Sequence, residues 1–364
     1  MTVTRWTLAA LLTVGGLAGC DSGDDPVVAV ATSTAVSAPS GTPDLGADEE
    51  IAQGIDVPWG LTFLPGGDAL VAERDTGRVL RLEPGGGTPR SGYEVPGVVP
   101  GGEGGLLGLA ASPDFATDNL VYAYFTAAQD NRIVRFRLDG GPAEVIFEGI
   151  AKAGNHNGGR LAFGPDGLLY AGTGDAGDTS RAQDPASPNG KILRLTPAGD
   201  PAPGNPVAGS PVYSLGHRNV QGLAWDAGGR MFATEFGQND RDEVNRIEAG
   251  RNYGWPEVEG EGGTDGGRFT NPVLTWPTDE ASPSGLAISG GTAYVAALRG
   301  QRLWTVPLTG DTAGKPTAYL HERYGRLRTV QIAPDGALWV TTSNTDRDRD
   351  VRAGDDRILR FPAR

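Results

Sequence analysis

Short apolar runs joined by tight turns recur along the chain. Each repeat begins with a small apolar pair, passes through a turn rich in Gly, Pro or Asp, and continues into a second run of strand-forming residues. Pro-Asp-Gly and Gly-Gly pairs favour tight turns, and alternating or continuously apolar runs of this length are typical of strands. The pattern can be read as GLTFLPGGDALVAE from Gly60, GLAASPDFATDNLVYAYF from Gly108, RLAFGPDGLLYAGTGD from Arg160, GLAWDAGGRMFATEFG from Gly222, GLAISGGTAYVAAL from Gly285 and TVQIAPDGALWVTTSN from Thr329.

A further strand, in most cases with alternating basic and apolar residues, follows the repeats. These strands are RVLRL at 78–82, RIVRFRL at 132–138, KILRL at 191–195, EVNRI at 243–247, RLWTV at 302–306 and RILRF at 357–361. The repeat starts at 60, 108, 160, 222, 285 and 329 are 44 to 63 residues apart. This spacing matches about one four-stranded blade per repeat.

The repeats predict an all-β fold, a six-bladed β-propeller. One blade cannot bury both of its faces, so neighbouring blades must stack around an axis. We expect the ring to close if an early strand near residues 51–55 joins the last blade. A pair of β-sandwiches, the alternative at this length, would not produce the same pattern six times.

Composition agrees with this prediction and narrows the function. The 364 residues include 57 glycines and 27 prolines, which suit many short strands and turns, and no long stretch has helical periodicity. The formal net charge is −14. Because phosphate binding rests on clustered positive charge, this balance argues against a nucleic-acid partner.

The amino terminus, MTVTRWTLAALLTVGGLAGC, has the pattern of an export signal. A single Arg precedes an apolar run, and the run ends in Leu17-Ala18-Gly19-Cys20, which contains the only cysteine of the chain. This pattern resembles a bacterial lipoprotein signal. We therefore expect a signal peptide over 1–20 with Cys20 lipidated, a flexible tether over 21–50 and the propeller over 51–364. The protein would be exported and lipid-anchored at the outer face of the cell membrane, or periplasmic, with no membrane contact beyond its anchor.

Polar residues that depart from the repeat gather at the blade entrances. In a propeller, the loops at one end of the blades form a shared funnel. Each residue taken singly has an ordinary explanation as a turn, cap or solvated residue, but their common placement favours a site. They are Glu103 in PGGEGGLLG, His156 in GNHNGGR, Asp175 in GTGDAGD, Arg218 and Asn219 in SLGHRNVQG, and Arg326 and Arg328 in RYGRLRT.

The residue types indicate the chemistry of that site. A neutral His156 can accept a proton, and a carboxylate such as Asp175 on its other nitrogen would orient the ring and raise its basicity. Arginines offer planar forks to carboxylates of a ligand. The segment TEFGQNDRDEVNRIEAGRNYGWP, with Glu235, Asp240, Asp242 and Glu243 in a glycine-bracketed loop, offers hard oxygen donors suited to calcium rather than zinc. Together these features predict an anionic redox cofactor beside a hydroxyl substrate.

At these residues the sequence resembles the soluble pyrroloquinoline quinone (PQQ)-dependent glucose/sorbosone dehydrogenase family, in its aldose sugar dehydrogenase branch. The resemblance extends from Val57 to Arg360. The motifs that carry it follow one another in family order: PWGLTFLPGG, GGEGGLLGLAASPDF, NHNGGRLAFGPDG, NGKILRL, GHRNVQG, DEVNRIEAGRNYGWP, SPSGLA and GRLRTVQIAPDGALWV.

The resemblance implies a six-bladed propeller that oxidises an aldose sugar to a lactone by hydride transfer to PQQ. It implies that His156 is the general base, supported by Asp175, and that Arg218 stabilises charge on the quinone as it is reduced. The remaining implied roles are quinone contacts for Asn219, cofactor carboxylate binding for Arg326 and Arg328, a cofactor or sugar contact for Glu103, an activating Ca²⁺ on the carbonyls of Gly237 and Gln238, and a second Ca²⁺ at Glu243 and the Tyr253 carbonyl.

The chain departs from the family pattern at three places. Gln238 replaces the usual Pro of the calcium loop, Arg299 replaces a lysine on the cofactor, and Asn155 stands where some members carry Asp. Two other functions stay open from the residues, a calcium-dependent lactonase and a non-catalytic binding module. The pattern identifies neither the preferred sugar nor the electron acceptor, and it leaves a monomer or a homodimer possible.

Overall fold

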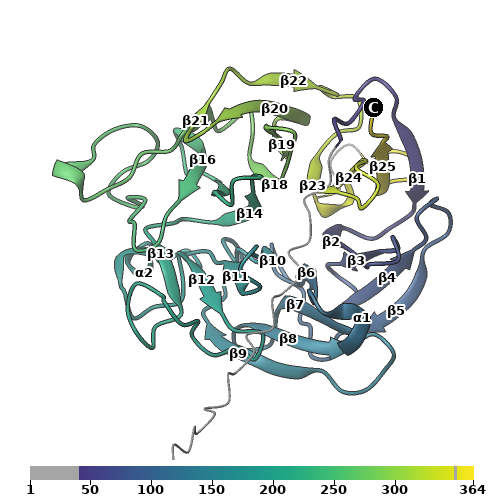
Figure 1. Ribbon diagram of the computed structural model, residues 1–364, viewed down its shortest axis with the longest axis horizontal. Helices are drawn as coiled ribbons and strands as arrows, with labels where there is room; N and C mark the ends of the chain where they lie inside the picture. The colour runs from purple at the N-terminus through teal and green to yellow at the C-terminus, as the bar shows by residue number, and fades with distance from the viewer. Residues whose placement is uncertain (1–40, 348–350) are drawn as a thin grey trace, which may run out of the picture. The chain divides into compact units, whose positions relative to one another are not determined.

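The computed structural model describes residues 41–347 and 351–364. The predicted signal peptide, Cys20 and most of the predicted tether lie outside these residues. Within them, the strands form six sheets arranged in a ring around a central axis (Figure 1). The prediction of an all-β, six-bladed propeller is therefore confirmed.

Each sheet is one blade, with its first strand innermost. The first three blades are β2–β5 (Pro58–Phe63, Ala69–Glu73, Arg78–Leu82, Arg90–Glu94), β6–β9 (Leu106–Ala111, Leu120–Thr126, Asn131–Arg137, Glu144–Ile150) and β10–β13 (Leu161–Phe163, Leu169–Gly172, Lys191–Leu195, Val212–Leu215). Helical turns are few in the described residues: α1 (Phe115–Asp118), α2 (Ser180–Gln183), η1 (Asp265–Gly267) and η2 (Thr345–Arg347).

The other three blades follow the same plan. They are β14–β17 (Val220–Trp225, Met231–Glu235, Arg241–Ile247, Leu274–Pro277), β18–β22 (Pro283–Ser289, Thr292–Ala297, Arg302–Thr309, Thr312–Ala313, Thr317–Tyr319) and β23–β25 with β1 (Leu327–Ile332, Leu338–Thr342, Arg357–Phe361, Glu49–Gln53). Every predicted strand pair and third strand is present.

The first strand closes the ring, as expected. Strand β1 pairs antiparallel with β25, from Glu49 opposite Arg360 to Gln53 opposite Arg357. The last blade begins before the predicted boundary at residue 51. The Asp44 amide donates to the Pro362 carbonyl at 2.8 Å, and Pro43 forms a bridge with Ala363. Residues 43–50, predicted as tether, thus belong to the last blade.

The hydrophobic core lies between neighbouring blades, and the inner strands touch closely at the axis. Val71 of the first blade, for example, packs in one cluster with Trp339 and Ile358 of the last. A Cβ on Gly60 would lie 2.4 Å from the Leu107 carbonyl oxygen, and one on Gly108 would lie 2.1 Å from that of Gly159. The glycine that opens most repeats is therefore required by the approach of adjacent backbones.

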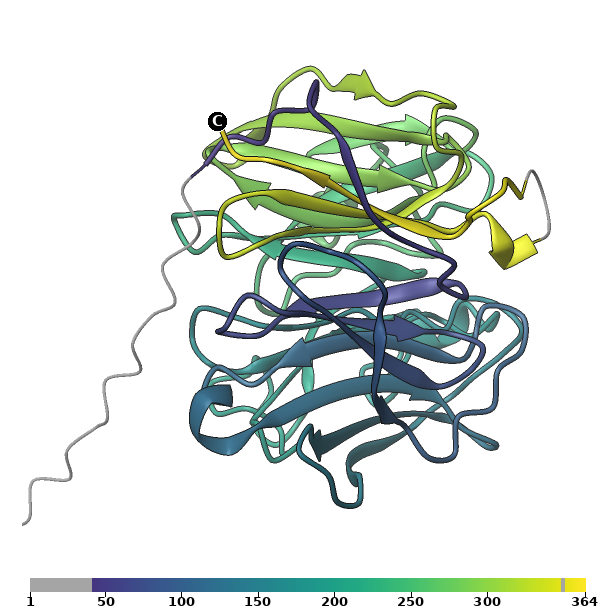
Figure 2. The same cartoon turned by 90° about the vertical axis from the view of Figure 1, so that its right-hand side faces the viewer.

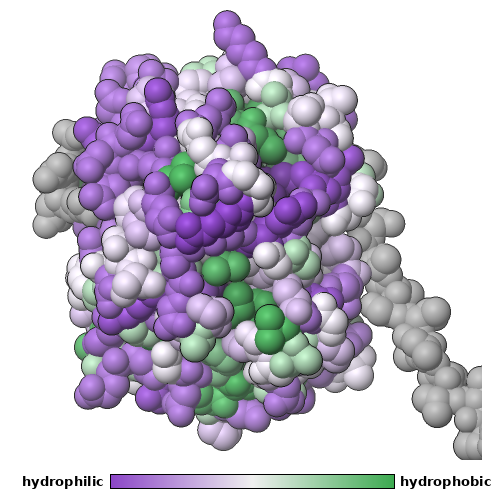
Figure 3. All heavy atoms as spheres, turned by 90° about the vertical axis from the view of Figure 1, so that its left-hand side faces the viewer, coloured by the Kyte–Doolittle hydropathy of each residue, from purple (hydrophilic) through white to green (hydrophobic). Residues whose placement is uncertain are grey.

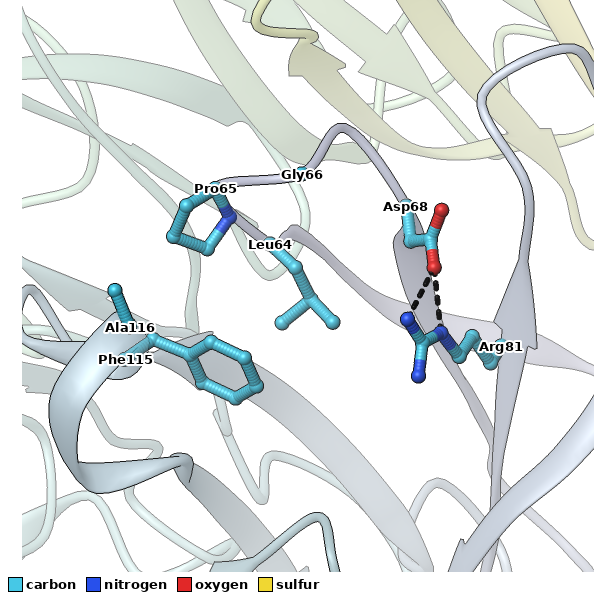
Figure 4. Close-up of a pocket in the computed structure, with 7 residues that line it drawn as sticks. All are labelled: Leu64, Pro65, Gly66, Asp68, Arg81, Phe115 and Ala116. Carbon is cyan, nitrogen blue, oxygen red and sulfur yellow. Dashed lines mark hydrogen bonds and ion pairs between the residues drawn. The ribbon is translucent and has the colours of Figure 1, made fainter.

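The two ends of the ring differ in their residues. The inner strands start, and the second strands finish, at one end of the ring. The Pro-Asp-Gly turns lie at the other end, and Figure 2 shows the strands running between the two. A hollow of about 420 Å³ at the turn end is lined by Leu64, Pro65, Gly66, Asp68, Arg81, Phe115 and Ala116 (Figure 4). Its only charged groups, Asp68 and Arg81, pair with each other at 2.5 Å. The candidate catalytic residues all lie at the opposite end.

The outer wall is largely polar on the side shown in Figure 3, where hydrophobic residues occupy small areas among hydrophilic ones. Within the described residues, no helix has the length and apolar character needed to cross a membrane.

Candidate active site

His156 and Asp175 form a hydrogen-bonded pair at the entrance of the third blade. The ring Nδ1 lies 2.7 Å from Asp175 Oδ1, and the Asp175 side chain is fully buried while 13% of the His156 side chain is exposed. Because Asp175 accepts from Nδ1–H, the lone pair of the neutral ring is on Nε2, the nitrogen 3.3 Å from the Asn155 amide nitrogen. The predicted base therefore has an orienting carboxylate on Nδ1 and, on Nε2, an acceptor that meets the exposed side-chain amide of Asn155.

Asp175 is held in its ionised form. Burial alone would raise its pKa, but hydrogen bonds from His156, the Gly177 amide and the Trp255 indole outweigh burial and lower the pKa. The indole Nε1 donates to Oδ2 at 2.9 Å, so both carboxylate oxygens are engaged. An ionised Asp175 can stabilise the imidazolium that forms when His156 takes a proton.

The backbone around His156 is fixed by contacts with two other blades. His156 has a positive φ of 54°, and a Cβ on Gly174 would lie 1.9 Å from its carbonyl oxygen, so Gly174 must lack a side chain. The His156 amide donates to Glu103 Oε2 at 2.9 Å, and the Gly158 amide donates to Asn219 Oδ1 at 2.9 Å. Glu103 and Asn219 thus position the segment that carries the base.

Arg218 and Asn219 present unsatisfied donors beside this pair. The Arg218 guanidinium lies 5.4 Å from the Trp255 ring centre, and its Nη1 donates to the Phe236 carbonyl at 3.2 Å. Burial lowers the pKa of Arg218, although Asp175 and Glu235 oppose that effect. Arg218 Nε and Asn219 Nδ2 are buried without a hydrogen-bond partner in the described residues. Such donors fit the oxygen atoms of a ligand.

Arg326 and Arg328 gather around a carboxylate that the sequence analysis did not single out. Asp346 lies 2.6 Å from Arg328 and 3.7 Å from Arg326, and it also pairs with Arg74. Burial would raise the pKa of Asp346, but the charges of Arg328 and Arg74 lower it to about 2. Arg74 also pairs with Asp75 at 2.7 Å. The arginine cluster, defined as Arg74, Arg326 and Arg328, thus gathers three cationic side chains around Asp346.

Glu103 links the two halves of the site. Glu103 attracts both Arg218 and Arg328, and these attractions counter the fall in the pKa of each arginine caused by burial. Arg299 lies in the turn after β19, at the same end of the ring, and is exposed. The site end thus combines a base with a ring of positive groups, an arrangement suited to an anionic ligand.

The residues expected to hold calcium lie next to Arg218, with one correction. Glu235, Asp242 and Glu243 were expected in a loop. Glu235 instead ends strand β15, and Asp242 and Glu243 are buried on strand β16, because the two strands stay paired up to Glu235 opposite Glu243. The loop before β16 is held by Glu259, which follows that strand in the sequence. Glu259 Oε1 accepts hydrogen bonds from the backbone amides of Gln238, Asn239, Asp240 and Arg241 at 2.7 to 3.1 Å. The Gly237 amide donates to Asp242 at 2.9 Å. These bonds fix the backbone whose carbonyls were predicted to bind calcium.

A small cavity of about 10 Å³ lies beside this loop and is bordered by Glu235, Glu243, Glu259 and Tyr253. Burial, followed by the charge of Glu235, raises the pKa of Glu243 to about 8. Asn245 Oδ1, next to Glu243, is buried without a partner in the described residues. Clustered carboxylates and an orphaned amide oxygen fit a hard cation. The described residues contain no cluster of three or more His, Cys, Asp and Glu side chains arranged for a metal, so carbonyls would have to complete the ligand set.

Comparison with known proteins decides the family. Residues 55–351 match the family described as Glucose / Sorbosone dehydrogenase. The chain belongs to the glucose/sorbosone dehydrogenase family. The predicted resemblance is thereby confirmed, and this family member is an oxidoreductase.

Several relatives of this glucose/sorbosone dehydrogenase have been characterised or solved. The PQQ-bound aldose sugar dehydrogenase of Streptomyces coelicolor is 54% identical, with a TM-score of 0.84 over 89% of this chain and 100% of that one. Aldose sugar dehydrogenase YliI of Escherichia coli is 29% identical over 82% of this chain and 90% of its own length. Quinoprotein glucose dehydrogenase B of Acinetobacter calcoaceticus is 30% identical over 61% of this chain and 54% of its length.

The structure adds residues to the site of this dehydrogenase family member. Trp255, Arg74 and Asp346 were missed, although Trp255 stands in the quoted GRNYGWP motif. A second histidine, His217, hydrogen-bonds Glu235 at 2.8 Å and Ser214 at 2.8 Å and stacks on Tyr253. Glu235 also accepts the Arg218 amide. His217 is fully buried, so its role is to hold Glu235 and Arg218 in place rather than to meet a substrate.

Proposed function

We propose that this protein oxidises aldose sugars to lactones at the anomeric carbon, with PQQ as hydride acceptor and calcium at the cofactor. The observation that carries the proposal is the His156–Asp175 pair, whose Nε2 meets only the exposed Asn155 amide, beside donors on Arg218 and Asn219 that lack partners in the described residues. The 54% identity to a dehydrogenase solved with PQQ supports the choice of cofactor. The arginine cluster supplies the positive charge that a tricarboxylate ligand needs.

PQQ would be held by Asn219, Arg326 and Arg328 and would supply the acceptor for the hydride of the anomeric carbon. Calcium on the carbonyls of Gly237 and Gln238 would supply a Lewis acid. His156 Nε2 would take the proton of the anomeric hydroxyl, so that the sugar loses one hydride and one proton and gains a C=O bond. Asp175 would stabilise the resulting imidazolium through Nδ1. Arg218, fixed by Glu235 and Trp255, would meet the negative charge that develops on the acceptor oxygen.

The proposal can be tested by reconstituting the ligand-free protein with PQQ and Ca²⁺ and following reduction of an artificial dye with a panel of aldoses. We expect turnover that requires both additions. His156→Ala should bind PQQ normally and lose roughly 10²- to 10⁴-fold in kcat. Calcium-dependent lactone hydrolysis without PQQ would favour the lactonase, and a folded protein that does not bind PQQ would favour the binding module.

We also propose that the chain is exported and lipidated at Cys20, so that the propeller works outside the cytoplasm. The support is the Leu17-Ala18-Gly19-Cys20 sequence after an apolar run. Metabolic labelling with a radioactive fatty acid, in cells that express the full chain or Cys20→Ser, tests this directly. Label in the wild type and none in the variant is expected, and an unlabelled wild type would refute the proposal.

A further inference from the structure

Arg160 occupies a position that glycine fills in most of the repeats. It opens the third repeat where Gly60, Gly108, Gly222 and Gly285 open four others. At those glycines the nearest atom of the adjacent backbone or side chains would lie 2.1 to 2.7 Å from a Cβ. The third blade instead has a long, cationic arginine side chain at this position, where the inner strands of the other blades approach closely.

The Arg160 side chain reaches inner strands of three other blades. Nε donates to the Gln221 carbonyl of β14 at 2.6 Å, and Nη2 donates to Thr329 Oγ1 of β23 at 3.1 Å. The guanidinium lies 4.3 Å from the ring centre of Trp59 in β2. Contacts with β2, β14 and β23 together place the guanidinium among the inner strands, near the axis of the ring.

This guanidinium has no counter-ion. Arg160 is 8% exposed, and no carboxylate of the described residues lies within ion-pair distance of it. Its charged neighbour is Arg328, which lies over the same Trp59 ring at 5.8 Å. Burial and then Arg328 lower the pKa of Arg160 to about 9. A buried charge without a partner is costly, so the site is electrostatically incomplete without an anion.

We propose that Arg160 is a ligand-binding residue, which together with Arg328 attracts the carboxylates of an anionic cofactor. The inference rests on the proposed function for the identity of that cofactor. The alternative is that Arg160 has only a structural role and joins the inner strands through Gln221, Thr329 and Trp59. The two roles differ in what they predict for binding. A structural role would affect the affinity for every ligand equally, whereas a charged binding residue would affect only the affinity for anionic ligands.

The test measures the Kd of PQQ and of its neutral trimethyl ester for the ligand-free protein with Ca²⁺, by calorimetry. Arg160→Met and Arg160→Gln remove the charge, and Arg160→Lys keeps it. Arg302→Met is the matched control, because Arg302 also stacks on a tryptophan, Trp304 at 5.2 Å, and donates to a carbonyl, but in the fifth blade away from the axis. Thermal unfolding identifies any variant that does not fold.

We expect both neutral variants to weaken PQQ binding by roughly tenfold to a hundredfold, the loss typical of a bond to a charged group. Their affinity for the trimethyl ester should change by less than about threefold. Arg160→Lys should keep most of the PQQ affinity, and Arg302→Met all of it. Unchanged PQQ binding in the neutral variants, or an equal loss for PQQ and ester, would overturn the proposal. A wild type that binds neither compound would overturn the proposed function as well.

Discussion

The His156 ring is oriented by neighbours that lie apart from it in sequence. Asp175 fixes which ring nitrogen carries the proton, and Trp255 donates to the other carboxylate oxygen from a position 80 residues further along. The same indole lies against Arg218. One tryptophan therefore connects the group that would take the proton with the group that would meet the acceptor's charge.

Removing the charge of Asp175 should disable the base without preventing cofactor binding. In Asp175→Asn the amide can present a donor to Nδ1 and select the wrong ring tautomer, so we expect kcat to fall roughly 10³- to 10⁴-fold. Steady-state kinetics and PQQ titration check the two expectations. If Asp175→Asn kept wild-type kcat, the orienting role of Asp175 would be wrong.

The same variant has a pH signature in stability. The folded-state pKa of Asp175 lies below its ordinary value of 3.8, so its ionised form contributes stability above that value and loses it as the pH falls through the lower folded-state pKa. The free energies of unfolding of wild type and Asp175→Asn should therefore converge below about pH 3.8. Urea denaturation from pH 3 to pH 7 measures this, and a pH-independent difference would contradict it.

At the scale of elements, the site is made where loops of different blades touch. The segment 154–160 is held against the end of β11 by Gly174, against the second blade by Glu103 and against the fourth by Asn219. These contacts leave no space for a side chain at position 174.

A methyl group at position 174 should displace the base. The Cβ in Gly174→Ala would lie 1.9 Å from the His156 carbonyl oxygen, whereas a Cβ at Gly66 meets nothing within 4 Å. We expect Gly174→Ala to cost about 1–3 kcal/mol of unfolding free energy and to lower kcat, and Gly66→Ala to change stability by less than about 0.5 kcal/mol. Equal stability and activity in the two variants would refute the close packing of this element.

Calcium should stabilise the loop between β15 and β16 and the strand that follows it. Ligand binding to the folded state at about a hundred times Kd adds about 2.7 kcal/mol. We expect Ca²⁺ to raise Tm, chelation to reverse the rise, and Glu243→Gln to reduce it. Glu83→Gln, an exposed carboxylate at the turn end of the first blade, is the control. A Tm that does not change when Ca²⁺ is added would exclude a calcium site at Glu243.

For the whole molecule, the repeats predict the ring and its closure, since both follow from local patterns repeated at regular spacing. The residues named at the blade entrances are brought to one end for the same reason. The pairing of Arg74 with Asp346, 272 residues apart, could not be predicted, because it depends on how the first and last blades meet. The reach of Arg160 across the axis has the same origin.

Ring closure by β1 should contribute measurably to stability. A chain that starts at residue 54 lacks the pairing of Glu49–Gln53 with β25, and it also exposes the edge of the last blade. Compared with a chain that starts at residue 41, we expect a fall in Tm of about 10 °C or more, equivalent to several kcal/mol. Equal Tm values from calorimetry would show that β1 is dispensable for closure.

The most direct test of the central claim is anaerobic stopped-flow absorbance of the protein loaded with PQQ and Ca²⁺ and mixed with an aldose. Wild type should lose the quinone absorbance in a single turnover, more slowly with sugar deuterated at the anomeric carbon, and His156→Ala should bind PQQ but fail to reduce it. Loaded wild type that no aldose reduces, or His156→Ala that reduces at the wild-type rate, would contradict the account.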